Sequence, residues 1–133
     1  MVKITARIIY SGKVQGVVLK SEAPLSFFGA VDPTTGLVKD SQHPLFGQCI
    51  AGKILIFPYA KGSTVGSYIL YGLKKRGLAP IGMILEECET IVAVGAIISE
   101  IPTVDRVRTN QFHTGDLVRI DEGEVYLEEK SHC

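Results

Sequence analysis

The chain has few cysteines, and their placement argues against a metal site. Cys49, Cys88 and Cys133 are the only three in 133 residues, widely spaced, with no C-x-x-C pair and no histidine at metal-ligand spacing. We expect Cys49 to be an ordinary buried thiol and Cys88, among acidic neighbours, to be a surface thiol. Cys133 falls in the polar tail 128–133, which we expect to be flexible.

Net charge and long apolar runs are also absent. The 14 lysines and arginines balance 14 aspartates and glutamates, which argues against nucleic acid as a partner. No apolar run approaches membrane-spanning length, and charges interrupt the first seven positions, so we expect a cytoplasmic protein without membrane contact. With no repeat, linker or low-complexity tract, residues 1–133 are interpreted as a single domain.

Several short segments have the composition of strands. Alternation of apolar and polar residues predicts a half-buried strand over 2–10. Short apolar runs bounded by glycine, proline or turn residues predict strands over 14–19, 25–28, 54–57, 81–85 and 91–98. The last run also suits a buried helix, but its length and β-branching favour a strand. A hairpin is expected from 117–120 and 124–127, and 105–112 is interpreted as a helical turn or loop.

The stretch 52–71 organises the rest of the chain. The strand 54–57 ends at a proline, and a polar segment leads into apolar residues at helical spacing that predict a helix over 64–76. Gly77 is typical of the position that follows a helix C-terminus. Together with the strand 81–85 these elements form one βαβ unit, so we expect a mixed α/β fold.

Gly62, Ser63 and Thr64 fall where this helix begins. Unpaired amides at a helix N-terminus attract carboxylate or phosphate, and strand-to-helix junctions are where open α/β folds bind ligands. The same residues have a purely structural interpretation, because hydroxyl side chains are favoured as helix caps. From composition alone, capping is the better explanation.

Several stretches together resemble the small subunit of the aconitase X type. They are KGSTVGS at 61–67, LSFFGAVDP at 25–33 and HPL at 43–45, followed in order by GAII at 95–98, IP at 101–102 and TGD at 114–116. The resemblance covers nearly the whole chain, and the archaeal members of that group are phosphomevalonate dehydratase small subunits. It implies a swivelling β/β/α domain with barrel-like β-rich layers around the βαβ unit of 54–85.

The resemblance also implies a function. The chain is expected to be a hydro-lyase subunit that is inactive alone and docks, as a heterodimer, on a large subunit carrying a 4Fe-4S cluster. No cofactor is expected on this chain, whose cysteines do not suit a cluster. The expected reaction is dehydration of mevalonate 5-phosphate to trans-anhydromevalonate 5-phosphate in isoprene biosynthesis, with Ser63 as the catalytic serine.

A serine hydroxyl removes a carbon-bound proton only where its alkoxide is stabilised. The amides that follow Ser63 and the charge of Lys61 offer that stabilisation, and Gly62, Thr64 and Ser67 are candidate substrate contacts. The better known aconitase relatives place an arginine just after their paired serines, whereas Val65 and Gly66 follow here. The supporting charge is therefore expected from Lys61 or from the other subunit.

Asp32 and His43 are further candidate substrate-binding residues, because they fall inside the stretches that carry the resemblance. From composition alone, Asp32 is better explained by the Asp-Pro-Thr-Thr-Gly turn that it begins, and lone histidines are usually structural. His113 and His132 are interpreted as surface residues. The acidic cluster of Glu86, Glu87 and Glu89 is interpreted as a solvated element end without chemistry.

Other functions remain open at this point. The substrate is alternatively another small hydroxy acid such as hydroxyproline, whose dehydratases belong to the same group. The chain is alternatively a non-catalytic module that binds a phosphate-bearing or carboxylate-bearing small molecule at the helix N-terminus. A phosphohistidine carrier domain shares this type of fold, but the sequence has no threonine-rich and glycine-rich loop with a histidine.

Overall fold

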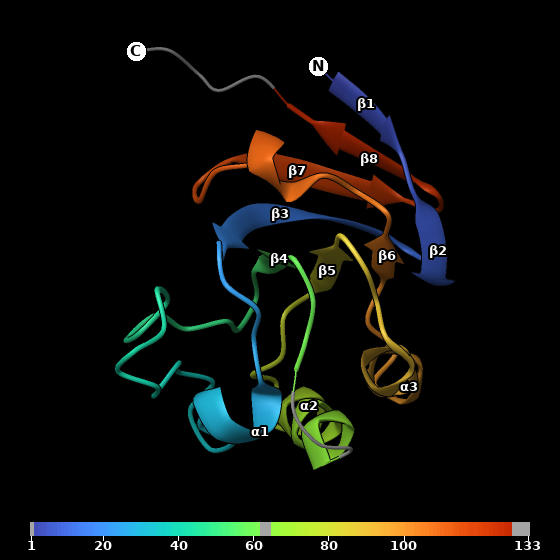
Figure 1. Ribbon diagram of the computed structural model, residues 1–133. Helices are drawn as coiled ribbons and strands as arrows, with labels where there is room; N and C mark the ends of the chain where they lie inside the picture. Colours follow the sequence, from blue (N-terminus) through green and yellow to red (C-terminus); the bar gives the residue numbers. More distant parts are fainter. Residues whose placement is uncertain (1, 62–64, 129–133) are drawn as a thin grey trace.

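The computed structural model describes residues 2–61 and 65–128 (Figure 1). The strands are β1 (Val2–Thr5), β2 (Arg7–Tyr10), β3 (Lys13–Lys20), β4 (Ile54–Phe57), β5 (Gly82–Leu85), β6 (Thr103–Asp105), β7 (Leu117–Asp121) and β8 (Glu124–Leu127). The helices are α1 (Phe27–Ala30), α2 (Val65–Lys75), α3 (Thr90–Ile98) and the 3-10 helix η1 (Thr109–Gln111). Within these ranges no helix is long and apolar enough to cross a bilayer.

The strands form one curled sheet in the order β1-β8-β7-β3-β4-β5-β6-β2. β3 to β6 run parallel, whereas β7, β8 and the two outer strands pair antiparallel with their neighbours. Only Ala6 separates β1 from β2, although the two strands lie at opposite edges of the sheet. The sheet is therefore bent into a nearly closed barrel, with the helices packed on one side (Figure 1). The expected β/β/α layering is confirmed.

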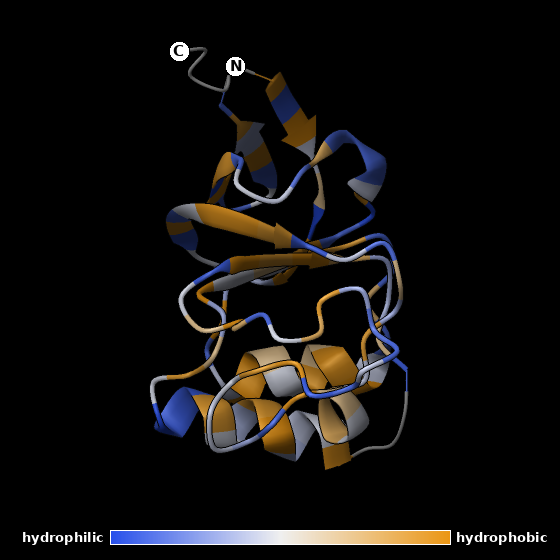
Figure 2. Ribbon diagram, turned by 90° about the vertical axis from the view of Figure 1, so that its left-hand side faces the viewer, coloured by the Kyte–Doolittle hydropathy of each residue, from blue (hydrophilic) through white to orange (hydrophobic). Residues whose placement is uncertain are grey.

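Two hydrophobic cores lie on either side of the parallel strands. In β4, Ile54 and Ile56 point into the barrel, while Leu55 and Phe57 pack toward the helices. All four are fully buried, which explains why the strand is an unbroken apolar run instead of an alternating one. Figure 2 shows hydrophobic residues along both the middle strands and the helices below them.

The predicted βαβ unit is confirmed. β4 pairs parallel with β5, and α2 connects them, with Leu70 and Leu73 buried against the sheet. α2 ends at Lys75, one residue before the predicted end, and Gly77 follows as the expected C-terminal glycine with a φ of 72°. Leu78 N donates to Leu73 O at 2.8 Å and closes the last turn. The predicted helix start at 64 lies outside the described residues.

Three strand predictions are corrected. The segment 2–10 is two strands, because the chain bends at Ala6 to reach the opposite edge of the sheet. The segment 25–28 contributes only an isolated bridge, from Leu25 to Ala60, before the short helix α1. Ser26 caps α1 by accepting from Gly29 N at 3.4 Å.

The prediction of a strand over 91–98 is also wrong, because this segment is the helix α3. In a run in which every residue is apolar, the hydrophobic periodicity cannot distinguish a buried strand from a buried helix. What makes the helix fit is Gly95, which brings α3 into close contact with α2. A Cβ added there would lie 3.2 Å from Ser67 Cα.

The remaining predictions are largely confirmed. The hairpin is β7 and β8, and the helical turn or loop of 105–112 includes η1. His113 is exposed, as expected. Cys49 is partly buried, whereas Cys88, predicted to be a surface thiol, is buried. The acidic neighbours of Cys88 point outward while its own side chain points inward, which sequence neighbours alone do not reveal.

Candidate active site

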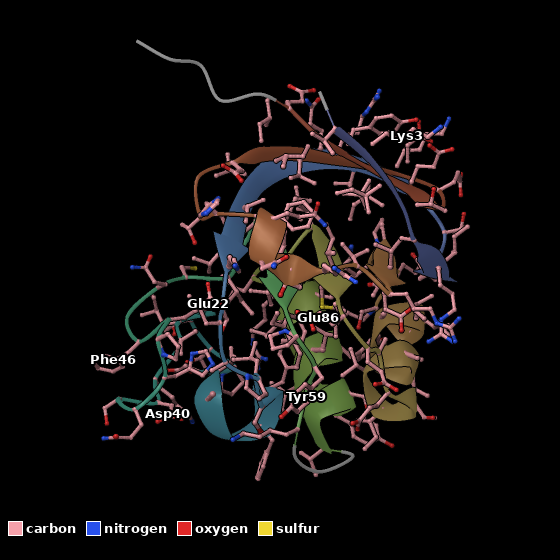
Figure 3. The ribbon with its side chains drawn as sticks, turned by 45° about the horizontal axis from the view of Figure 1, so that its top comes forward. Lys3, Glu22, Asp40, Phe46, Tyr59 and Glu86 are labelled. Carbon is pink, nitrogen blue, oxygen red and sulfur yellow. The ribbon has the colours of Figure 1, made fainter. Side chains whose placement is uncertain are left out.

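The loops that follow three parallel strands meet at one edge of the sheet. Pro58 O, just after β4, accepts from Glu86 N at 3.0 Å and Glu87 N at 3.1 Å, just after β5. Glu86 O in turn accepts from Arg106 N, just after β6, at 3.0 Å. Figure 3 labels Tyr59 and Glu86 on two of these loops. Ligands of α/β folds bind at such carboxyl edges.

A first cleft, called the α2 cleft below, opens where this edge meets the helices. It is lined by Phe27, Ala60, Lys61, Gly66, Ser67, Leu70, Glu89, Ile91 and Val92. The lining is mostly apolar, with Lys61, Ser67 and Glu89 as its polar side chains. A mostly apolar pocket with a few polar groups is the common form of a small-molecule site.

A second cleft, the α1 cleft, lies beside the first. It is lined by Ala23, Pro24, Ser26, Gly29, Ala30, Asp40, Gln42, His43, Pro44 and Lys61. Lys61 borders both clefts, and among residues 2–61 and 65–128 its exposed side chain is the only lysine or arginine in either lining. Figure 3 shows Asp40 and Phe46 on the long loop beside α1.

The position of Lys61 is set by its main chain. Lys61 N donates to Leu25 O at 3.1 Å, and Leu25 N donates to Tyr59 O at 3.2 Å. This short ladder ties the segment after β4 to the segment before α1. Ser67 lies in the first turns of α2, against Gly95 of α3, so the cleft wall depends on how closely the two helices pack.

His43 shapes the α1 cleft through backbone contacts. Its Nδ1 accepts from Leu45 N at 3.1 Å, so this nitrogen carries no proton. Its Nε2 lies 3.1 Å from Pro24 O and therefore donates to that carbonyl. With both ring nitrogens engaged, His43 holds the 43–45 turn against the segment before α1.

Asp32 lies away from both clefts. Its Oδ1 accepts from Thr34 N at 2.8 Å and from Thr34 Oγ1 at 2.7 Å, and these hydrogen bonds lower the pKa of the Asp32 carboxyl. The turn packs on the C-terminal end of α2, where Arg76 Nη1 donates to Pro33 O at 3.3 Å. The structure thus brings Lys61, Ser67 and His43 near the clefts but not Asp32.

The predicted site residues Gly62, Ser63 and Thr64 lie outside the described residues. Lys61 before them and Gly66 after them both line the α2 cleft. Glu89 is a cleft residue that sequence reasoning did not assign. It is the N-cap residue of α3, so its place beside the cleft follows from the helix that the sequence analysis took for a strand.

A buried carboxylate supports the cleft wall from behind. Asp105 accepts from Arg7 Nε at 2.8 Å, from Arg7 Nη2 at 2.6 Å and from Cys88 N at 2.8 Å. These bonds tie β2 and β6 to the segment that leads into α3. Burial, aided by the Asp105 charge, raises the pKa of the Cys88 thiol to about 11, so the thiol is protonated at neutral pH.

The chain has close relatives of known type. It is 50% identical over 129 residues to the phosphomevalonate dehydratase small subunit of Thermococcus sibiricus, covering 96% of this chain and 99% of that protein. It is 54% identical over 127 residues to the protein of the same name from Thermococcus kodakarensis, covering 94% and 96%.

A solved structure and a family model agree with these relatives. The crystal structure of Thermococcus kodakaraensis aconitase X in its holo-form superposes with a TM-score of 0.95 at 53% identity, covering 97% of this chain and 100% of that chain. Residues 3–128 match the model of the aconitase X swivel domain. The resemblance found in the sequence is confirmed, and the chain belongs to the aconitase X swivel domain family.

Proposed function

We propose that this chain is the small subunit of a cytoplasmic hydro-lyase that dehydrates mevalonate 5-phosphate to trans-anhydromevalonate 5-phosphate. The observation that carries the proposal is the identity of about half of all residues to phosphomevalonate dehydratase small subunits, over nearly the full length of both chains. A match of this extent includes the loop, both clefts and the helices that border them. It favours the same substrate over hydroxyproline and over a binding role without chemistry.

In this proposal Ser63 removes the carbon-bound proton of the substrate. Its neighbours in sequence, Lys61 and Gly66, border the α2 cleft, which supports a position for Ser63 beside that cleft. Lys61 is the cation available to favour the serine alkoxide or to bind an anionic group of the substrate. Ser67, which lines the same cleft, is proposed as a substrate contact, as are Gly62 and Thr64. His43 contributes by holding the α1 cleft in shape.

The cluster expected in this family does not fit this chain. Among residues 2–61 and 65–128, no three histidine, cysteine, aspartate or glutamate side chains gather as a metal site. Cys88 is buried and protonated at neutral pH, unlike the thiolates that hold iron–sulfur clusters. We therefore assign the 4Fe-4S cluster to a larger subunit.

Exposed aromatic side chains on the elements around the site support docking of that larger subunit. Phe28 is 55% exposed, Tyr59 44% and Tyr68 71%. They belong to α1, to the loop after β4 and to α2, which are the elements around the α2 cleft. Large exposed aromatic side chains on neighbouring elements are typical of an interface. Docking there would also exclude water from Lys61 and strengthen its electrostatic effect.

The proposal is tested with the heterodimer, made by co-expression with the cognate larger subunit and assayed anaerobically with mevalonate 5-phosphate. The wild-type complex is expected to turn over the substrate. Ser63→Ala is expected to lower kcat at least about a hundredfold, the usual contribution of a general base. Thr64→Ala, which removes a neighbouring hydroxyl, serves as the matched control and is expected to lose less.

Three results would contradict the proposal in different ways. Near-normal turnover by the Ser63→Ala complex would exclude this serine as the base while leaving the reaction intact. A wild-type complex that dehydrates hydroxyproline but not mevalonate 5-phosphate would change the substrate. Binding of mevalonate 5-phosphate without any turnover, in a complex with an intact cluster, would favour the non-catalytic module.

A further inference from the structure

The helix α3 has an apolar face that nothing in the described chain covers. Its nine residues, Thr90–Ile98, include no charged side chain. One face is buried against α2 and the sheet through Val92, Gly95 and Ala96. On the other face Val94 is 45% exposed, Ile97 49% and Ile98 42%. Helices that are apolar all round are normally buried all round, so this exposure indicates a partner.

Val94, Ile97 and Ile98, called the α3 stripe below, form one continuous surface. They are spaced at i, i+3 and i+4, which places them side by side on a helix. Ile91 lies one turn before Val94 and lines the α2 cleft. Figure 1 shows α3 beside α2 at the side of the helical layer, with its outer face away from the sheet. The α3 stripe therefore runs outward from the rim of the cleft.

The size of the α3 stripe argues against a second copy of this chain as its partner. Three half-exposed aliphatic side chains offer on the order of 250 Å², whereas each side of a stable interface buries about 800 Å². The stripe alone is too small for a stable dimer. It adjoins the α2 cleft through Ile91, so an interface centred on the cleft would extend over it.

We propose that the α3 stripe is buried against the larger subunit, so that the interface extends from the cleft rim along the outer face of α3. The inference rests on the proposed function, because the larger subunit is the partner that the cleft rim would meet. The matching surface on that subunit is apolar, since the α3 stripe offers neither a charge nor a hydrogen-bonding side chain.

The test compares two exposed positions on different faces. Ile97→Lys places a charge in the α3 stripe, and Leu117→Lys places the same charge on β7, on the barrel, where Leu117 is 40% exposed. The dissociation constant for the larger subunit is measured by anaerobic titration calorimetry, after circular dichroism has shown that each variant is folded. Ile97→Lys is expected to raise this dissociation constant at least tenfold. Leu117→Lys is expected to leave it within twofold of the wild-type value. At saturating larger subunit, kcat of the Ile97→Lys complex is expected to match wild type.

A second measurement uses the unmodified chain and does not depend on folding of a variant. Carbene footprinting is expected to find peptide 94–98 labelled in the isolated chain and protected in the complex, with peptide 117–121 unchanged. Equal affinity of Ile97→Lys and wild type, or labelling of 94–98 that persists in the complex, would overturn the inference while leaving the proposed function intact. A wild-type chain that binds no larger subunit would overturn both. Light scattering that finds a dimer of the isolated chain, dissociated by Ile97→Lys, would assign the stripe to a second copy.

Discussion

Among single residues, Asp105 has the most demanding environment. Its side chain is completely buried, and burial by itself would raise the pKa of a carboxyl group. The hydrogen bonds from Arg7 and Cys88 N, together with the Arg7 charge, outweigh burial and hold the pKa of Asp105 below its usual value. Arg7 itself remains 44% exposed on its side chain, so it keeps contact with water while it neutralises the carboxylate. The charged form of Asp105 is therefore part of the folded state.

This arrangement predicts a pH dependence with a definite sign. Because the pKa of Asp105 is lower in the folded than in the unfolded chain, the stabilisation is complete above about pH 4, the unfolded value, and is lost as the pH falls through the folded value. Asp105→Asn is expected to lower the midpoint of thermal unfolding at pH 7. The difference in this midpoint between wild type and Asp105→Asn should become smaller between pH 4 and pH 3.

Thermal unfolding followed by circular dichroism at pH 7, 5, 4 and 3 measures this effect. Glu87→Gln removes an exposed carboxylate on the same edge of the sheet and serves as the control, with no change expected at any of these pH values. If the difference in midpoint between Asp105→Asn and wild type stays constant from pH 7 to pH 3, the charge of Asp105 does not contribute to stability.

Among the elements, the pair α2 and α3 decides the geometry of the α2 cleft. A Cβ added at Gly95 would lie 3.2 Å from both Leu70 Cδ2 and Ser67 Cα, a separation that forces one of the neighbours to move. Ser67 Cα is backbone, so relief requires a shift of the first turns of α2. Those turns carry Gly66 and Ser67, which line the α2 cleft, so the packing of the two helices sets the position of this cleft wall.

Gly95→Ala is therefore expected to affect activity more than stability. The higher helix propensity of alanine stabilises the folded chain by up to about 1 kcal/mol, whereas overpacking destabilises it by about 1–3 kcal/mol. The net change in the free energy of unfolding is therefore small. The kcat/KM of the heterodimer is expected to fall at least tenfold. Gly72→Ala in α2 is the matched control, because its Cβ would meet only the flexible end of Arg76, at 3.4 Å.

Urea unfolding and steady-state kinetics on the two variants separate these effects. Gly72→Ala is expected to retain wild-type kinetics and to gain stability. Wild-type kcat/KM in Gly95→Ala would mean that α2 and α3 can separate without disturbing the site.

At the scale of the whole molecule, the parallel strands stabilise two cores at once. Ile84 of β5 is buried inside the barrel, and the next residue, Leu85, is buried against the helices. Neither core can form without the strands that the other needs. The barrel and the helical layer are therefore expected to unfold together.

Ile84→Ala and Leu85→Ala are each expected to lower the free energy of unfolding by about 2–5 kcal/mol, the usual cost of removing a large buried aliphatic side chain. Both variants should keep a single transition in urea, with fluorescence of the tyrosines and circular dichroism coinciding. Two separate transitions in either variant would mean that the cores are independent.

Much of this architecture was predictable from the sequence. The βαβ unit was found because the apolar run of β4 ends at Pro58 and α2 carries a helical period that ends at Gly77. The hairpin of β7 and β8 was found from alternation around a glycine turn. These signals are local, so each can be read from a window of about ten residues.

The failures have a common physical cause. The segment 91–98 is apolar throughout, and whether it becomes strand or helix depends on what it packs against, which for α3 is the surface of α2 around Ser67. The bend at Ala6 depends on a sheet that closes between strands far apart in sequence. The burial of Cys88 likewise involves a distant residue, because Cys88 N donates to the carboxylate of Asp105, 17 positions later.

The sequence by itself determined the βαβ unit, because it follows from local spacing, and the family, because several stretches are shared in order with relatives. Ser63 as the base stays a prediction from that resemblance. Only the tertiary structure placed Lys61 between two clefts, moved Asp32 to the far end of α2, brought Glu89 to the cleft and left one face of α3 exposed. The reason is that each of these facts concerns distances between segments that are distant along the chain. Such distances are set by the packing of two cores against a shared sheet, and no short stretch of sequence contains them.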